Sequence, residues 1–294
     1  MRTAAPLLTA GEWEAIRGLS VAPRRGLRGF AAGEQRSSFP GSGIEFAEYR
    51  EYVPGDDARL LDWNVFLGSR RFLVRVAAQE KELALVVLVD ASASMFSGEP
   101  SKALAAQRIG AGLAAIALGG GNRAGFFSIG SGLEELVRPE RSRHGLAEYL
   151  GASASLEPAR DFYPIEALSV FSARYANKCL PVLISDFLFP GWESVLRTLG
   201  AAGGSPFVVQ VLSSEELDPS LSGEATLVDL EDGSEAAFFA DPRLLSRYRA
   251  ELDAHLSAVR RAASASGVGY ALASSDFDLL ELFHGRFRAG GLLC

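Results

Sequence analysis

The sequence predicts an α/β fold: a doubly wound, mainly parallel sheet with helices on both faces. Two observations support this prediction. From about residue 81 onward, short runs rich in β-branched and other apolar residues alternate with longer amphipathic stretches. The runs are apolar without interruption, which is typical of strands that are covered on both faces. The 48% hydrophobic and 22% charged residues fit a globular protein with a sizeable core.

The apolar runs give the expected strands, and the amphipathic stretches give the expected helices. The predicted strands are Leu83–Asp90, Arg123–Ile129, Leu180–Ser185, Phe207–Leu212 and Gly269–Ala273. The predicted helices between them are Ser101–Leu118, Arg143–Gly151, Tyr163–Tyr175 and Trp192–Ala201. The glycines of "GAGLAAIALGGG" lie inside the first helix and do not follow a strand, so we interpret them as packing positions and not as a dinucleotide loop.

Two further elements are expected near the C-terminus. Asp241 followed by Pro242 is a favourable N-cap and first-turn pair for a helix that runs to about Ser266. The preceding stretch, "TLVDLEDGSEAAFFAD", contains two strand-like runs joined by Asp232-Gly233, which indicates a hairpin.

Residues 1 to about 80 have a different texture, being rich in arginine, glycine and aromatic residues with scattered turn signals. We expect an N-terminal segment of short strands and turns over 1–80, followed by the α/β domain over 81–294. Within the segment, "YVPGDDARLLDW" brings together several charged and aromatic residues. They form either local turn and ion-pair contacts or a surface that docks a partner. The residues are Asp56, Asp57, Arg59, Asp62 and Trp63.

Charge, composition and the absence of certain motifs exclude several classes of function. The net charge of −7 argues against binding to nucleic acid, which requires a basic surface. The two cysteines have no metal-like or redox spacing, and no apolar run is long enough to span a bilayer. No nucleotide P-loop and no G-x-S-x-G elbow occur. We therefore expect a cytoplasmic protein with no membrane span and no bound nucleotide.

Polar residues follow two of the predicted strands. Asp90, Ser92 and Ser94 follow the first strand in "LVVLVDASASM", and Asp186 ends "LPVLISD". Ligands of doubly wound sheets bind outside the carboxyl ends of the strands, where the strand order reverses. Two carboxylates and two hydroxyls are hard oxygen ligands that suit Mg²⁺. Alternatively, Asp186 is only a turn or cap residue.

The motifs "DASASM" and "LISDF" resemble the metal-ion-dependent adhesion site of von Willebrand factor A domains. The flanking "GSGIEFAEYREYVPGDDARLLDWN" and "FLVRVAAQEKELALVVLVDASASM" resemble the bacterial family called domain of unknown function 58. The resemblance implies that Asp90, Ser92, Ser94 and Asp186 hold a metal ion whose shell is completed by a carboxylate of a partner protein. It also implies a threonine ligand from a third loop, but in "EPARDFYPIEAL" that place is held by Arg160.

Because of Arg160, the sequence leaves open whether the site holds a metal ion. A guanidinium cannot ligate Mg²⁺ and would repel it. Arg160 could pair with Asp90 or Asp186 and so close the site or substitute for the metal. Alternatively, Arg160 points to solvent, and Asp161 or water serves as the ligand.

The resemblance implies a non-enzymatic interaction module or adaptor that captures an acidic group of a protein partner. The partner implied is a MoxR-type AAA+ ATPase or its client, in protein assembly or remodelling. The alternative is a Mg²⁺-dependent phosphoester hydrolase. For that activity the sequence lacks a general acid, because Ser92 stands where dehalogenase-type phosphatases have a second aspartate.

Overall fold

The computed structural model describes residues 7–22, 46–54, 56–57, 61–77, 83–140, 145–220, 223–228 and 234–294. These residues fall into two compact units. The larger unit contains the described residues before 23 and from 83 onward, and the smaller unit contains those from 46 to 77.

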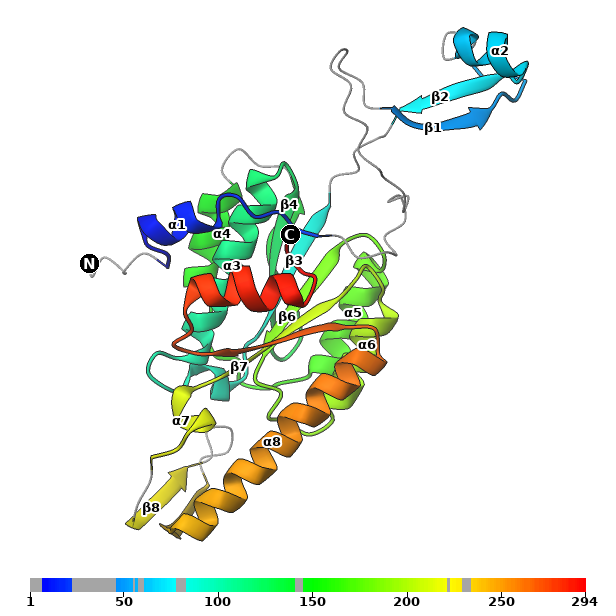
Figure 1. Ribbon diagram of the computed structural model, residues 1–294. Coiled ribbons are helices and arrows are strands. Elements are labelled where there is room, and N and C mark those ends of the chain that lie inside the picture. The colour runs from blue at the N-terminus through cyan, green and yellow to red at the C-terminus, as the bar shows by residue number, and fades with distance from the viewer. Residues whose placement is uncertain are drawn as a thin grey trace. The chain divides into compact units, whose positions relative to one another are not determined.

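The larger unit is built on a six-stranded sheet (Figure 1). Its strands are β3 (Ala84–Asp90), β4 (Arg123–Ile129), β5 (Leu133–Glu140), β6 (Leu180–Ser185), β7 (Phe207–Leu212) and β10 (Gly269–Ser274). Their order is β10-β7-β6-β3-β4-β5, and only β5 runs antiparallel to its neighbour. The predicted doubly wound, mainly parallel sheet is therefore confirmed. The strand order reverses between β3 and β6, and this pair is the switch point of the sheet.

Helices cover both faces of the sheet (Figure 1). One face is covered by α1 (Ala10–Ile16), α3 (Lys102–Gly119), α4 (Gly145–Ala154) and the π-helical η3 (Glu281–Phe287). The other face is covered by α5 (Pro164–Tyr175), α6 (Trp192–Ala201) and the C-terminal part of α8 (Pro242–Ala265). Among the described residues, no helix has the length and apolar character needed to cross a membrane.

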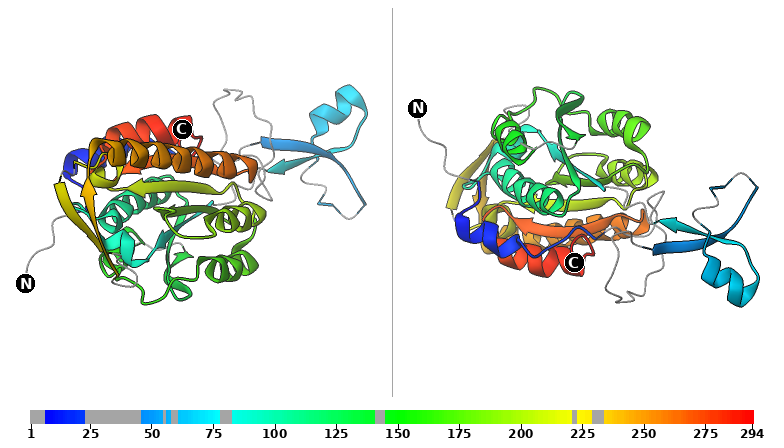
Figure 2. Two further views of the ribbon diagram at one scale, coloured as in Figure 1. Left: turned by 90° about the horizontal axis from the view of Figure 1, so that it is seen from below. Right: turned by 90° about the horizontal axis from the view of Figure 1, so that it is seen from above.

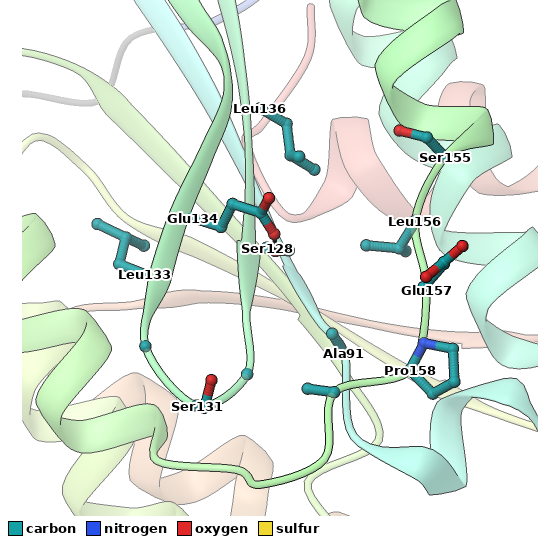
Figure 3. A pocket seen from close by; sticks show the side chains of 13 residues that line it. Ala91, Ser128, Ser131, Leu133, Glu134, Leu136, Ser155, Leu156, Glu157 and Pro158 are labelled. Carbon is teal, nitrogen blue, oxygen red and sulfur yellow. Dashed lines mark hydrogen bonds between the residues drawn. The ribbon is translucent and has the colours of Figure 1, made fainter.

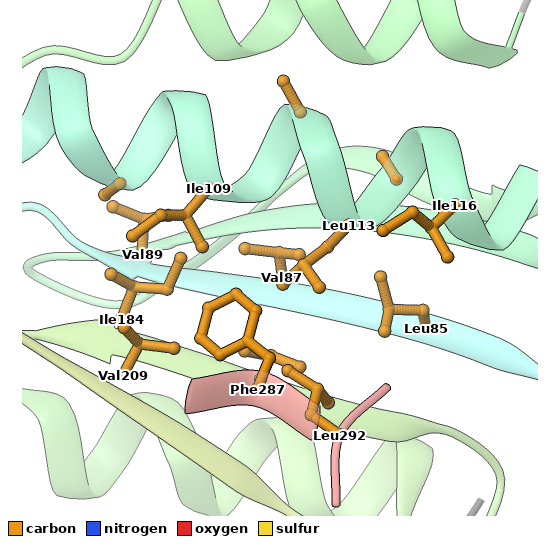
Figure 4. Packing of buried hydrophobic residues seen from close by; sticks show 14 of the residues in the cluster. Leu85, Val87, Val89, Ile109, Leu113, Ile116, Ile184, Val209, Phe287 and Leu292 are labelled. Atoms are coloured by element: carbon orange, nitrogen blue, oxygen red, sulfur yellow. The ribbon is translucent and has the colours of Figure 1, made fainter. Parts of the chain in front are cut away.

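The core is divided by the central strand. Every residue of β3 is buried, and its side chains alternate between the two faces. Leu85, Val87 and Val89 pack under Ile109 and Leu113 of α3, as Figure 4 shows. The neighbours Val86 and Leu88 face the opposite cluster. Burial on both faces explains why β3 is apolar throughout up to Asp90.

The smaller unit consists of an antiparallel pair and a short helix. Strand β1 (Phe46–Glu51) pairs with β2 (Leu73–Ala77), and α2 (Trp63–Ser69) lies between them in the sequence. The carboxylate of Asp62 caps α2 by accepting hydrogen bonds from the backbone N–H groups of residues 64 and 65.

The prediction of one N-terminal segment over 1–80 is wrong for its first part, which includes helix α1. Helix α1 belongs to the larger unit, because Arg108 of α3 donates to Glu12 at 2.6 Å and to the Leu7 carbonyl at 3.2 Å. Ser20 also exchanges backbone hydrogen bonds with Cys294, at the other end of the chain. Only the described residues from 46 to 77 form a separate unit.

The C-terminal elements follow the prediction. Strands β8 (Gly223–Val228) and β9 (Glu235–Ala240) pair as a hairpin, while its predicted turn, Asp232-Gly233, lies outside the described residues. The hairpin lies at the N-terminal end of α8 (Figures 1 and 2). Asp241 caps α8 through a 2.7 Å hydrogen bond from the backbone N–H of Leu244.

Candidate functional site

The structure brings the two predicted acids to the switch point of the sheet. Asp90 ends β3, and Asp186 follows β6 directly. The two strands are parallel neighbours, with Val89 beside Ile184 in the register. Parallel neighbours carry their carboxyl ends to the same edge, and so Asp90 and Asp186 reach the rim together.

Asp90 is held by hydrogen bonds within the chain. Its residue is 1% exposed. One carboxylate oxygen, Oδ1, accepts from the backbone N–H of Ser92 at 2.8 Å, and Oδ2 accepts from Ser185 Oγ at 2.5 Å. Burial and the neighbouring Asp186 carboxylate raise the pKa of Asp90 to about 7. Asp90 therefore organises the loop that carries the two serines.

The two serine hydroxyls form a chain that leads to the second acid. Ser92 Oγ lies 3.1 Å from Ser94 Oγ, and Ser94 Oγ donates to Asp186 Oδ2 at 2.9 Å. The other oxygen, Asp186 Oδ1, accepts from the backbone N–H of Leu188 at 3.0 Å. The four residues predicted from sequence thus form one hydrogen-bonded group.

The cation of this group is Lys102, which the sequence reasoning missed. Lys102 is the first residue of α3, and its side chain is 0% exposed. Its ammonium donates to Asp186 Oδ2 at 2.8 Å and to Glu216 Oε1 at 2.6 Å. Burial alone would lower the pKa of Lys102, but the two carboxylates outweigh it and hold the pKa above its ordinary value. The side chain is therefore charged at neutral pH. We call Asp90, Ser92, Ser94, Lys102 and Asp186 the switch-point site.

Two more side chains hold the switch-point site in place. Glu216, in the short helix α7 (Ser214–Leu217), also accepts from the Ser213 backbone N–H at 2.7 Å. The buried Gln210 of β7 donates to the Asp186 carbonyl at 2.9 Å and accepts from the Tyr270 hydroxyl at 2.9 Å. Asp186 therefore accepts hydrogen bonds with its carboxylate and with its backbone carbonyl.

Arg160 does not close the site. It is exposed, and no hydrogen bond or ion pair joins it to Asp90 or Asp186. The reason lies in the preceding residue: the Ala159 backbone N–H donates to the Ala91 carbonyl at 2.8 Å. Figure 3 shows this loop passing beside Ala91, where loop and Ala91 both line a cavity of about 490 Å³ that none of the predicted site residues lines. The hypothesis that Arg160 pairs with the acids is thus wrong, and Lys102 pairs with Asp186 instead.

A cavity of about 720 Å³ opens over the switch-point site. Ser92, Ser94 and Asp186 lie in its lining, and exposed apolar side chains surround it. We call this apolar set the rim: Tyr163 is 50% exposed, Leu188 48% and Ile165 39%. Phe162 and Phe189 also line the cavity, with their rings edge to face at 4.9 Å between centroids, and so do Glu166 and Glu216. A polar floor thus lies within an apolar rim.

The oxygens predicted to hold Mg²⁺ already have hydrogen-bond donors within the chain. An ion bound about 2.1 Å from Asp186 Oδ2 would lie within about 5 Å of the Lys102 ammonium, because Nζ is 2.8 Å from that oxygen. At an effective dielectric constant near 20, a double and a single positive charge at that distance repel by about 7 kcal/mol, and this repulsion offsets part of the attraction of the ion to the carboxylates. Within the described part of the chain, no three His, Cys, Asp or Glu residues form a metal-ligating group. This donor set does not fit a resident divalent cation.

The second predicted surface lies in the smaller unit. Asp62 is 3% exposed and serves as the α2 cap, whereas Trp63 beside it is 57% exposed. Asp56 accepts from the backbone N–H of Val53 at 2.9 Å, as in a turn, and Asp57 is exposed. Arg59 lies outside the described residues. Of the described members, Trp63 is the one large apolar side chain open to a partner.

Comparison with known proteins identifies a family. Residues 48–258 match the model of the family described as "Protein of unknown function DUF58". The uncharacterized protein Rv1480 of Mycobacterium tuberculosis is 29% identical over 273 residues, which cover 90% of this chain and 86% of that protein. The resemblance predicted from the motifs is confirmed by the family match.

Similar solved structures include the conserved hypothetical protein BatB from Bacteroides thetaiotaomicron, at 12% identity and a TM-score of 0.46. The alignment covers 71% of this chain and 98% of the BatB chain. The SpRpn10 VWA domain is also 12% identical, with a TM-score of 0.40, over 69% of this chain and 94% of that one. At this level of similarity, the fold class rests on the strand order of the chain itself.

Proposed function

The chain belongs to the family of proteins of unknown function DUF58, and we propose that it is a non-enzymatic protein-interaction module of the cytoplasm. In this proposal, a partner protein docks on the rim and reaches the switch-point site through the cavity. We further propose that the partner is a MoxR-type AAA+ ATPase or its client, as the family resemblance implies.

The observation that supports this proposal is the exposed apolar rim around a polar floor. Tyr163, Ile165 and Leu188 are each between 39% and 50% exposed around one opening. Contiguous exposed apolar surface bordered by polar groups is typical of protein-binding sites. Aromatic and aliphatic anchors provide most of the energy of such interfaces, and buried polar groups provide orientation.

The charges of the cavity indicate which partner group fits. Glu166, Asp186 and Glu216 line the cavity, and none of the described residues that line it is basic. An acidic partner group, as the resemblance implies, would need a metal ion to overcome these carboxylates. Without a metal, the cavity favours an apolar segment that carries a basic or neutral hydrogen-bonding group. We therefore propose a partner segment of that kind.

No specific observation favours the alternative of a Mg²⁺-dependent phosphoester hydrolase. Asp90 would be its nucleophile, yet Asp90 is 1% exposed and does not line the cavity. Both of its carboxylate oxygens accept hydrogen bonds, from Ser92 and Ser185. Glu216 does line the cavity, but its oxygens accept from Lys102 and from the Ser213 backbone, so it is engaged in structural contacts.

The proposal is tested by measuring binding to a purified MoxR-type ATPase from the same organism. The variants are Tyr163→Ser and Leu188→Ser, which change exposed rim residues. The matched control is Val170→Ser on α5, because Val170 is 51% exposed and does not line the cavity. Loss of one interface anchor is expected to weaken binding about 10-fold or more.

The outcomes are distinct. Weaker binding by both rim variants, with the control within twofold of wild type, supports the docking site. Equal binding by all four proteins refutes the location of the site. No binding by the wild-type protein to the ATPase, at concentrations up to about 100 μM, refutes that partner.

A further inference from the structure

The buried lysine of the switch-point site has no role in the sequence-based prediction. Lys102 lies in the first turn of α3, where the partial positive charge of a helix N-terminus disfavours a cation. Its side chain is also fully buried, although a buried ammonium is stable only with anionic partners. Both costs are offset by Asp186 at 2.8 Å and Glu216 at 2.6 Å.

The position of the ammonium matters as much as its charge. It contacts Asp186 Oδ2, the same oxygen that accepts from Ser94 Oγ. That oxygen and the two serine hydroxyls are among the ligands that the family resemblance implies for a metal ion, together with Asp90. The ammonium is therefore bound to the group of atoms on which a divalent ion would depend.

We propose that Lys102 is the resident cation of the switch-point site and takes the place of a divalent metal ion. A tethered ammonium offsets the charge of Asp186, whose Oδ2 also accepts from the Ser94 hydroxyl, without any ion from solution. The site is then formed at any Mg²⁺ concentration. This inference concerns the site's cation and does not depend on whether a partner docks at the rim.

The inference also assigns different roles to the two basic residues near the site. Arg160 replaces the threonine ligand that the resemblance implies, but its side chain is exposed and makes no contact with the acids. Removing its charge should leave the ammonium where it is. Removing the Lys102 ammonium should instead free Asp186 and the hydroxyls of Ser92 and Ser94 for another cation.

The test measures binding of Mg²⁺ and Mn²⁺, added as their chlorides. Binding is measured by titration calorimetry and by the change in Tm on thermal unfolding at constant ionic strength. The proteins are wild type, Arg160→Thr, Lys102→Ala and the double variant Lys102→Ala/Ser94→Ala. We expect no saturable binding up to about 10 mM by wild type or Arg160→Thr. We expect Lys102→Ala to bind one ion, with a Tm that rises by about 5 °C at 100-fold excess over Kd. The double variant should lose this binding.

Several results would overturn the proposal. One is stoichiometric binding of either ion by wild type. Another is binding by Arg160→Thr, since that would make Arg160 the residue that excludes the metal. A third is a folded Lys102→Ala protein that binds neither ion. If Lys102→Ala does not fold, wild type and Arg160→Thr decide the question. Because none of these assays involves a partner, their failure is separate from failure of the proposed function.

Discussion

Replacing Lys102 by methionine tests how much the ammonium stabilises the fold. Methionine keeps most of the length of the side chain and removes the charge, so the buried carboxylate of Asp186 loses its ion pair. Lys102 and Asp186 are 0% and 1% exposed, whereas Glu216 is 27% exposed and partly solvated. Removing one partner of a buried ion pair costs about 3–5 kcal/mol. We expect Lys102→Met to lower the free energy of unfolding by that amount, and the Tm by on the order of 10 °C.

A double-mutant cycle shows whether the cost comes from the pair. Urea unfolding of wild type, Lys102→Met, Asp186→Asn and the double variant gives four free energies, with the m-values as a check on the unfolded state. The double variant removes both charges together and should cost less than the sum of the single variants, by about 2 kcal/mol. Lys178→Met is the matched control, because Lys178 is exposed and its ammonium donates only to a backbone carbonyl. Its effect should stay within about 0.5 kcal/mol.

The reasoning is refuted by either of two results. In one, Lys102→Met costs less than about 1 kcal/mol, which is the value of an exposed pair. In the other, the two single costs add within about 0.5 kcal/mol, which would mean that Lys102 and Asp186 do not interact in solution.

Three further substitutions test other parts of the structure. Gly112→Ala should cost about 1–3 kcal/mol in thermal unfolding despite the better helix propensity of alanine, because its Cβ would lie 2.6 Å from the buried Phe283 ring; an unchanged Tm would contradict the packing of α3 on η3. Gln210→Leu should cost about 1–3 kcal/mol in urea unfolding, since it leaves the Tyr270 hydroxyl and a buried carbonyl without partners; a neutral effect would argue against that network. Hydrogen bonds from two arginines hold the pKa of Glu135 below its ordinary value, so its contribution is present above that value and lost as the pH falls through the folded pKa. Glu135→Gln should therefore destabilise by about 0.5–1 kcal/mol at pH 7, and this cost should shrink as the pH falls through the lowered pKa of Glu135; a cost that does not change with pH would point to a cause other than charge.

The fold could be predicted because burial and sequence pattern agree in most elements. Strands β4, β6 and β7 begin and end where expected, since central parallel strands must be apolar on both faces. Strand β5 was not expected. It is an antiparallel edge strand, and its sequence "LEELVRPE" contains four charged residues and a proline, so it lacks the apolar run of the central strands. Helix α1 was also missed, although its Thr9 and Glu12 form a capping box, a signal that the sequence does contain.

The site was predictable only in part, for a physical reason. The positions of Asp90 and Asp186 follow from strand ends and a parallel sheet, and so could be inferred locally. The contacts of Lys102 join residues 84 and 114 positions apart in the chain, and they depend on the final sheet order. One signal was nevertheless present: a lysine in the first turn of an apolar helix is unfavourable unless a carboxylate lies near. The sequence-based hypothesis instead paired the acids with Arg160, which stands where the family resemblance implies a threonine ligand.

The most direct test of the central claim is a crystal structure grown with MnCl₂, with anomalous diffraction used to locate the metal. We predict no manganese peak among Ser92, Ser94 and Asp186, and a Lys102 ammonium within hydrogen-bonding distance of Asp186. A manganese ion ligated by the two serine hydroxyls, with Lys102 turned away from Asp186, would contradict the claim.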